Sequence, residues 1–164
     1  MSTVISNSSP LIGFSAIGRL DLIQRTFGHV LIPEAVEREV NTPAKSLATP
    51  TRSWEPIRAD WLGVVCVKEN RDLAILRESL GAGETEAIML AIERGLPILL
   101  DDLPARKTAV RLKLRPIGSL GILAKCKYAG VIREAKPLVR NLQDAGIFYA
   151  KDLIEGFLHK IGEI

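Results

Sequence analysis

The chain has 164 residues, of which 47% are hydrophobic and 25% charged, and its net charge is +3. This composition suits one globular domain with a sizeable core. No apolar run approaches the roughly 18 residues that span a membrane, and a small positive charge permits a polyanionic partner without requiring one.

Neither the cysteines nor the N-terminus indicates export. Cys66 and Cys126 are far apart and form neither a CxxC metal motif nor a disulfide framework. No basic stretch followed by an apolar run opens the chain, so we expect no secretory signal. A reducing, cytoplasmic compartment fits best. We interpret Cys66, within the run LGVVCV, as a buried strand residue.

Short apolar segments alternate with helical patterns from one end of the chain to the other. The expected strands lie at 3–6, 29–32, 62–68, 96–102 and within 115–120. The expected helices lie at 10–17, 19–28, 33–40, 71–80, 83–95, 104–114, about 119–128, 134–144 and 150–160, with an exposed loop at 41–53. Runs such as VVCV and PILL are apolar throughout, which is typical of sheets covered on both faces. The order predicts an α/β protein with a mainly parallel sheet, whose ligands bind at the carboxyl ends of the strands.

Acidic residues follow the predicted strands. Asp101 and Asp102 come directly after PILL, and the alternation of strand side chains predicts that only one of them points into the crevice. A helix cap before Pro104 explains an aspartate here equally well. Glu39 adjoins the apolar face of its helix, although a solvated face is the commoner reason for such a glutamate.

The helix at 83–95 begins with two glutamates. Glu84 and Glu86 are two residues apart, so they point to nearly opposite sides and only one can face a shared site. Met89 and Leu90 place Glu86 beside the buried face, and Glu84 looks more exposed. A glutamate bordering the core needs a partner, which can be a metal, an arginine or a hydrogen-bond network.

Together these acids suggest one oxygen-rich cluster, of the kind that holds Mg²⁺ or Mn²⁺. The chain has no HxxxH or HExxH pair, no GxxxxGK[ST] loop and no GxSxG elbow. Zinc, histidine-based and serine hydrolase chemistry are therefore disfavoured. A phosphoryl-accepting domain that uses Asp102 is a weaker alternative, because no suitable lysine follows the last strand.

Five successive blocks of the chain resemble the PIN-like proteins. They are VISNSSPLIGFSAIGRLDLI, IPEAVEREV, LGAGETEAIMLAIERG, ILLDD and IGSLGILAKCKYAGVI. The nearest resemblance is to the prokaryotic, uncharacterised branch of predicted toxin-type nucleases, over about residues 3–160. It implies one domain over 1–164 with a three-layer α/β/α fold, in which helices flank a twisted parallel sheet of about five strands.

The resemblance also implies an acidic pocket that binds Mg²⁺ or Mn²⁺ and cleaves RNA. Three family acids match Glu39, Glu86 and Asp102, which would be the catalytic residues, and Asp101 is a neighbour. Asn7 stands where the family has its first acid, and together with those three it would hold the metal. Ser8 and Ser9 match the small hydroxyl residue that orients a ligand or water.

Asn7 leaves two functions open. An amide oxygen can bind a metal but brings no charge, and fewer charges weaken both metal binding and water activation. The chain is therefore either a metal-dependent endoribonuclease, which could be the toxin of a pair with a small antitoxin, or a catalytically weak module that binds RNA or a protein.

Two further surfaces carry expectations. Arg106, Lys107 and Arg111 follow Asp102 and could meet RNA phosphates, although a solvated helix face explains them as well. The helices at 134–160 carry a wide apolar stripe that either packs on the domain or forms a dimer surface, and homo-oligomers are common in the family.

Overall fold

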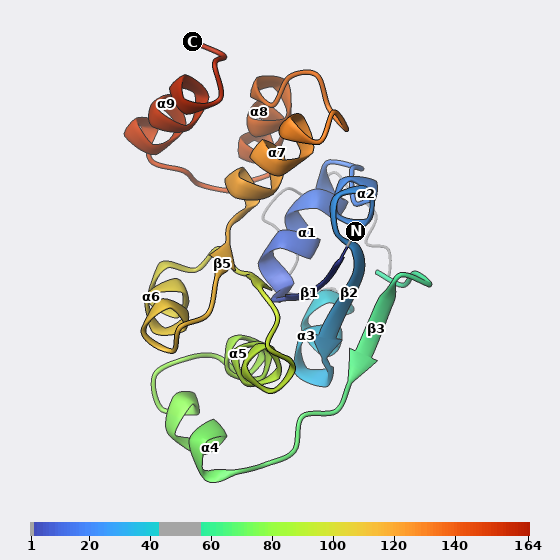
Figure 1. Ribbon diagram of the computed structural model, residues 1–164, viewed down its shortest axis with the longest axis vertical. Helices are drawn as coiled ribbons and strands as arrows, with labels where there is room; N and C mark the ends of the chain where they lie inside the picture. Colours follow the sequence, from blue (N-terminus) through green and yellow to red (C-terminus); the bar gives the residue numbers. More distant parts are fainter. Residues whose placement is uncertain (1, 43–56) are drawn as a thin grey trace.

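The computed structural model describes residues 2–42 and 57–164 (Figure 1). Most of the expected loop at 41–53 lies outside these residues. Within them, five parallel strands form one sheet in the order β3-β2-β1-β4-β5. The strands are β1 (Ser2–Ser6), β2 (Gly28–Pro33), β3 (Leu62–Val65), β4 (Ile98–Leu99) and β5 (Pro116–Ile117).

Helices connect and cover the strands. They are α1 (Ser8–Ala16), α2 (Asp21–Phe27), α3 (Glu34–Val40), α4 (Arg71–Arg77), α5 (Ala82–Arg94), α6 (Leu103–Arg111), α7 (Ser119–Tyr128), α8 (Lys136–Asp144) and α9 (Lys151–Lys160). The arrangement is the three-layer α/β/α fold that was predicted. Figure 1 shows α7, α8 and α9 together at one end of the molecule and α4 at the other. No helix in the described ranges is both long and apolar enough to cross a bilayer.

The centre of the sheet is fully buried. Ile5 of β1, Ile32 of β2 and Leu99 of β4 have no exposed surface. α5 packs against β1, β2 and β4, and its residues Thr85–Ala91 are buried without interruption. Because β1 is central, the residue that follows it comes out in the middle of the carboxyl edge, where a parallel sheet binds its ligands.

The edge strand β3 corrects one prediction. Val64 is 46% exposed, and Cys66 lies just beyond the end of the strand and is exposed. The interpretation of Cys66 as a buried residue was therefore wrong. The reason is topological, since β3 pairs with β2 alone and leaves its other side without a neighbouring strand. An apolar run does not reveal which strand lies at an edge.

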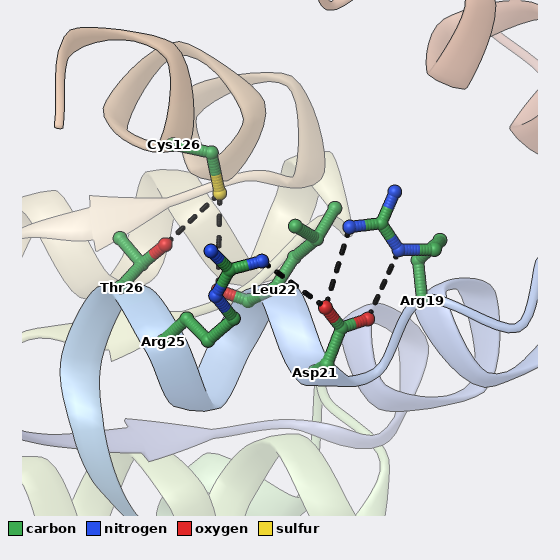
Figure 2. Close-up of polar contacts among 6 residues, drawn as sticks. All are labelled: Arg19, Asp21, Leu22, Arg25, Thr26 and Cys126. Carbon is green, nitrogen blue, oxygen red and sulfur yellow. Dashed lines mark hydrogen bonds and ion pairs between the residues drawn. The ribbon is translucent and has the colours of Figure 1, made fainter. Parts of the chain in front are cut away.

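Cys126 is the buried thiol, and it joins α2 to α7 (Figure 2). Its Sγ lies 2.9 Å from Oγ1 of Thr26 and donates to the carbonyl of Leu22 at 3.8 Å. Burial raises the pKa of the Cys126 thiol, so the group stays neutral and serves packing. This contact fixes α7, whose first residue, Ser119, lies at the carboxyl edge.

The apolar stripe of α9 is divided between core and solvent. Leu158 and Ile161 are 5% and 7% exposed and belong to the core, whereas Leu153 is 55% exposed. Phe148, in the connection from α8, is 88% exposed. Part of the 134–160 segment therefore packs on the fold, and a dimer surface formed by the remainder stays a prediction.

Candidate acidic site

Asn7 lies at the centre of the carboxyl edge. Its backbone N–H donates to the carbonyl of Leu99 at 2.9 Å, which joins the ends of β1 and β4. The residue is 2% exposed, and its side-chain Oδ1 is buried without a hydrogen-bond partner in the described part of the chain. A buried oxygen without a donor costs about 1–3 kcal/mol. It therefore marks a position where a cation or a water would be stabilised.

Glu39 reaches this edge from the last turn of α3. Its Oε2 accepts from Oγ of Ser8 at 2.7 Å, and its Oε1 accepts from the backbone N–H of Gly83 at 3.1 Å. One carboxylate thus ties the residue after Asn7 to the first turn of α5. Ser8 is the hydroxyl residue beside the acid, while Ser9 is exposed.

Glu84 is the α5 glutamate that shares the environment of the other acids. Burial raises the pKa of the Glu84 carboxyl, and the negative charges of Asp102 and Glu39 raise it further, while the backbone N–H of Gly81 opposes them. That N–H donates to Oε2 of Glu84 at 3.1 Å and fixes the side chain at the start of the helix. Sequence reasoning set Glu84 aside because it looked more exposed.

Glu86 has a different charged neighbour from Glu84. It is 7% exposed, and its charged neighbour is Arg77, whose Nη2 lies 3.9 Å from Oε2 of Glu86. Arg77 also pairs with Glu69, so it links α4 and the segment before it to α5. The partner that a core-bordering glutamate requires is here an arginine, and a role for Glu86 as a metal ligand stays a prediction.

The two aspartates after β4 have different partners, as alternation predicted. Oδ2 of Asp102 accepts from the backbone N–H of Ala105 at 3.0 Å and caps α6. Asp102 is thus a helix cap, and its negative charge also raises the pKa of the Glu84 carboxyl. Asp101 instead accepts from the backbone N–H of Ser119 at 2.7 Å and from its Oγ at 2.6 Å. It holds the first turn of α7.

Sequence reasoning missed Tyr149, which reaches Asp101 from the connection between α8 and α9. Burial and the negative charge of Asp101 raise the pKa of the Tyr149 phenol. No local pattern could have shown this, because the interaction joins segments that are far apart in the chain. The connection between α8 and α9 therefore lies within electrostatic reach of Asp101.

The three basic residues of α6 separate into two groups. Nη1 of Arg106 donates to the carbonyl of Leu100 at 2.9 Å, and a Cβ on Gly118 would lie 2.8 Å from that same nitrogen. Arg106 is therefore turned inward and supports the turn after β4. Lys107 and Arg111 are exposed.

The donors at this edge have the chemistry of a magnesium or manganese site. Asn7 offers an amide oxygen, and Glu39, Glu84 and Asp102 offer carboxylates, which are the ligand types these ions prefer. In the part of the chain that the structure describes, no three acidic, histidine or cysteine side chains stand close enough together to hold an ion. Binding would therefore draw these carboxylates together from their present hydrogen bonds.

The fold and site define a class: an all-parallel α/β protein with carboxylates gathered at the carboxyl edge around its central strand. The family model DUF3368, described as a PIN domain, matches residues 3–163. The chain belongs to this family. PIN domains have a nuclease-type fold and generally use divalent metal ions. Comparison with curated proteins and with solved structures gave no match.

Proposed function

We propose that this protein is an endoribonuclease that uses Mg²⁺ or Mn²⁺ to hydrolyse phosphodiester bonds in RNA. The observation that supports it best is the buried Oδ1 of Asn7, which has no partner among the described residues and lies at the sheet edge next to Ser8, whose hydroxyl binds the Glu39 carboxylate at 2.7 Å. A hydrogen-bonding group without a partner in such a place calls for a ligand.

Each residue of the site has a separate task in this proposal. Asn7 and the three carboxylates would hold the ion, which when bound would supply positive charge for the phosphate and activation of the attacking water. Ser8 orients Glu39 through its 2.7 Å hydrogen bond, and Gly83 allows the carboxylate to approach the backbone of α5. Asp101 holds α7 in place beside the site through Ser119.

The wider setting of the proposal comes from the family. We propose one domain over 1–164, with RNA as substrate, a small antitoxin protein as partner, a homo-oligomer as the assembly and the cytoplasm as the compartment. In that setting the nuclease is the toxin of a toxin–antitoxin pair.

One observation favours a second function. Asn7 is neutral, and it sits at the position where the site is most buried. A site that lacks one negative charge binds a divalent ion less tightly. The second candidate is therefore a module that binds RNA or a protein without cutting RNA efficiently.

The test is cleavage of labelled single-stranded RNA with Mn²⁺ or Mg²⁺ and with EDTA as the control. We expect cleavage to require the ion and to fall roughly 100-fold or more in Asp102→Asn and in Glu84→Gln, because each removes a negative charge that would hold the ion. Glu93→Gln, at an exposed glutamate of the same helix, is the matched control and should have an activity close to that of the wild type, whereas Glu86→Gln tests the other glutamate in the first half of α5.

Two results would count against the proposal. Cleavage that persists in EDTA would exclude the metal, and a loss of activity confined to Glu86→Gln would place the site elsewhere. RNA that is bound but not cut would favour the second candidate.

A further inference from the structure

The exposed face of α6 carries two cations without a partner. Lys107 and Arg111 are four residues apart, so they lie on one face and about 6 Å apart along the helix axis. Among the described residues, no ion pair or hydrogen bond involves either side chain. An exposed pair of this kind is available to a ligand.

These cations line a groove of about 310 Å³. One wall is the face of α6 from Leu103 to Arg111, and the other is Ser79 and Leu80 in the connection between α4 and α5. Thr108 also lines it, between the two cations in sequence. Figure 1 shows α4, α5 and α6 next to one another on this side of the molecule.

The groove begins where the acidic site ends. Leu80 precedes Gly81, whose N–H holds the Glu84 carboxylate, and Leu103 follows Asp102. Both walls are therefore continuous with residues that carry the proposed site. A chain molecule cut at the acids would pass directly into the groove.

The lining suits a polyanion. It combines two cations with the hydroxyls of Ser79 and Thr108, and none of the described residues that line it carries a carboxylate. Leu103, 61% exposed at the start of α6, offers an apolar surface to a sugar or base. None of the described residues that line the groove is aromatic, so this part of it lacks the stacking platform with which single-strand binding proteins hold bases. Contacts to phosphates position a nucleic acid without reading its sequence.

We propose that this groove holds single-stranded RNA on one side of the cleavage position, with Lys107 and Arg111 each neutralising one backbone phosphate. The inference rests on the proposed function for the position of the cut, but the binding itself does not. Arg106 takes no part, because its guanidinium is occupied by Leu100.

The experiment measures binding in EDTA, where metal-dependent cleavage is absent. Fluorescence anisotropy would follow a labelled oligoribonucleotide of about twelve nucleotides, a length within the usual site sizes of single-strand binding folds, over a series of salt concentrations. For Lys107→Gln/Arg111→Gln we expect roughly tenfold weaker binding, and a slope of log K against log salt that is less steep by about 1.4, which corresponds to two phosphate contacts.

Two further variants separate position from net charge and from packing. Arg140→Gln/Lys160→Gln removes the same number of charges from exposed sites on α8 and α9 and should leave the slope unchanged. Lys107→Arg/Arg111→Lys keeps both charges and should bind like the wild type. The melting temperature of each variant confirms that it is folded.

Equal slopes of log K against log salt in the groove variant and the wild type would overturn the inference. That result is also the one expected if the groove binds a protein instead of RNA. Equal losses in the groove variant and in Arg140→Gln/Lys160→Gln would also overturn it. Glu84→Gln separates this inference from the proposed function, because it should lose cleavage while keeping RNA binding in EDTA. A groove variant that cleaves RNA fully and keeps the wild-type salt slope would refute the groove and leave the nuclease standing.

Discussion

At the scale of single residues, the absence of a Cβ at Gly83 shapes the acidic site. A Cβ on Gly83 would lie 2.5 Å from Oε1 and 2.6 Å from Oε2 of Glu39, which is closer than a Cβ approaches an atom to which it is not bonded. Glycine therefore allows the Glu39 carboxylate to reach the first turn of α5, where it accepts from the Gly83 N–H. The helix end and the carboxylate attract each other, because a helix N-terminus carries partial positive charge.

Asn7→Asp is the most informative single change at the site. The new carboxylate would add the charge that the amide lacks, so we expect roughly tenfold tighter Mn²⁺ binding and faster cleavage of RNA. Without the ion, a charge at a residue that is 2% exposed should destabilise the fold by roughly 1–3 kcal/mol. Melting temperatures with and without Mn²⁺ measure both effects, since an ion that binds only the folded chain stabilises it.

Asn7→Ser is the matched control, because it removes the amide oxygen without adding charge. Its melting temperature should respond to Mn²⁺ less than that of the wild type. If Asn7→Asp neither gains a larger response to the ion nor cleaves faster, Asn7 is not a ligand.

Part of this candidate site could be predicted from the sequence. Asn7 and Asp102 drew attention because polar residues near the end of a strand in a parallel sheet lie at the edge where ligands bind. Burial favoured Glu86, which lies near Arg77. The hydrogen bond from the Gly81 N–H to Glu84 and the charges of Asp102 and Glu39 near that carboxyl could not be predicted, because no local pattern displays them.

At the scale of elements, α6 begins at a side-chain cap and is followed by a turn with an unfavourable backbone conformation. Asp102 caps its first turn, and the N–H of Leu114 closes its end on the carbonyl of Ala109 at 2.9 Å. The residue at the turn is Lys113, with φ of 63°, a left-handed conformation that favours glycine. The groove helix is therefore followed by one strained position, which lies outside the groove.

We expect Lys113→Gly to stabilise the protein by roughly 0.5–1 kcal/mol, because relief of a left-handed side chain outweighs the added freedom of the unfolded chain. Urea denaturation measures the change. Lys113→Ala removes the same charge but keeps a Cβ in the left-handed region, so it should give no such gain. Equal stabilities for the two variants would show that the turn is not strained.

The helices and their order were predicted closely, and the strands less so. Helices have caps and a repeating apolar face, so the expected segments at 119–128 and 150–160 agree with α7 and α9 within a residue. Of the expected strand at 96–102, only Ile98–Leu99 pairs in register with β1 and β5, because the chain turns toward α6 after Leu100. An apolar run records burial, and burial extends beyond the hydrogen-bonded ladder.

At the scale of the whole molecule, the chain terminus fastens the C-terminal helices together. The Glu163 carboxylate accepts from Nζ of Lys127 at 2.8 Å and from the backbone N–H groups of Ala135 and Lys136 at 2.7 and 2.8 Å. It therefore joins the last turn of α7 to the first turn of α8, beyond the end of α9.

Glu163→Gln tests that arrangement through its dependence on pH. Burial opposes ionisation of Glu163, but Lys127 and the two N–H groups outweigh it and lower the pKa of the carboxyl below its ordinary value of 4.5. Because the pKa is lower in the folded state, the stabilisation is complete above 4.5 and disappears as the pH falls through the lowered value. We expect the variant to lose roughly 1–3 kcal/mol at neutral pH, since the Glu163 side chain is only 7% exposed. The difference should shrink in acid, where the wild-type carboxyl is itself protonated.

Glu155→Gln is the control variant, and it removes the exposed partner of Lys151 on α9. It should lower the free energy of unfolding by less than about 0.5 kcal/mol at either pH. Urea midpoints at neutral and acid pH measure both variants, and a Glu163→Gln loss that stays constant with pH would mean that the ionised carboxylate is not what holds the helices together.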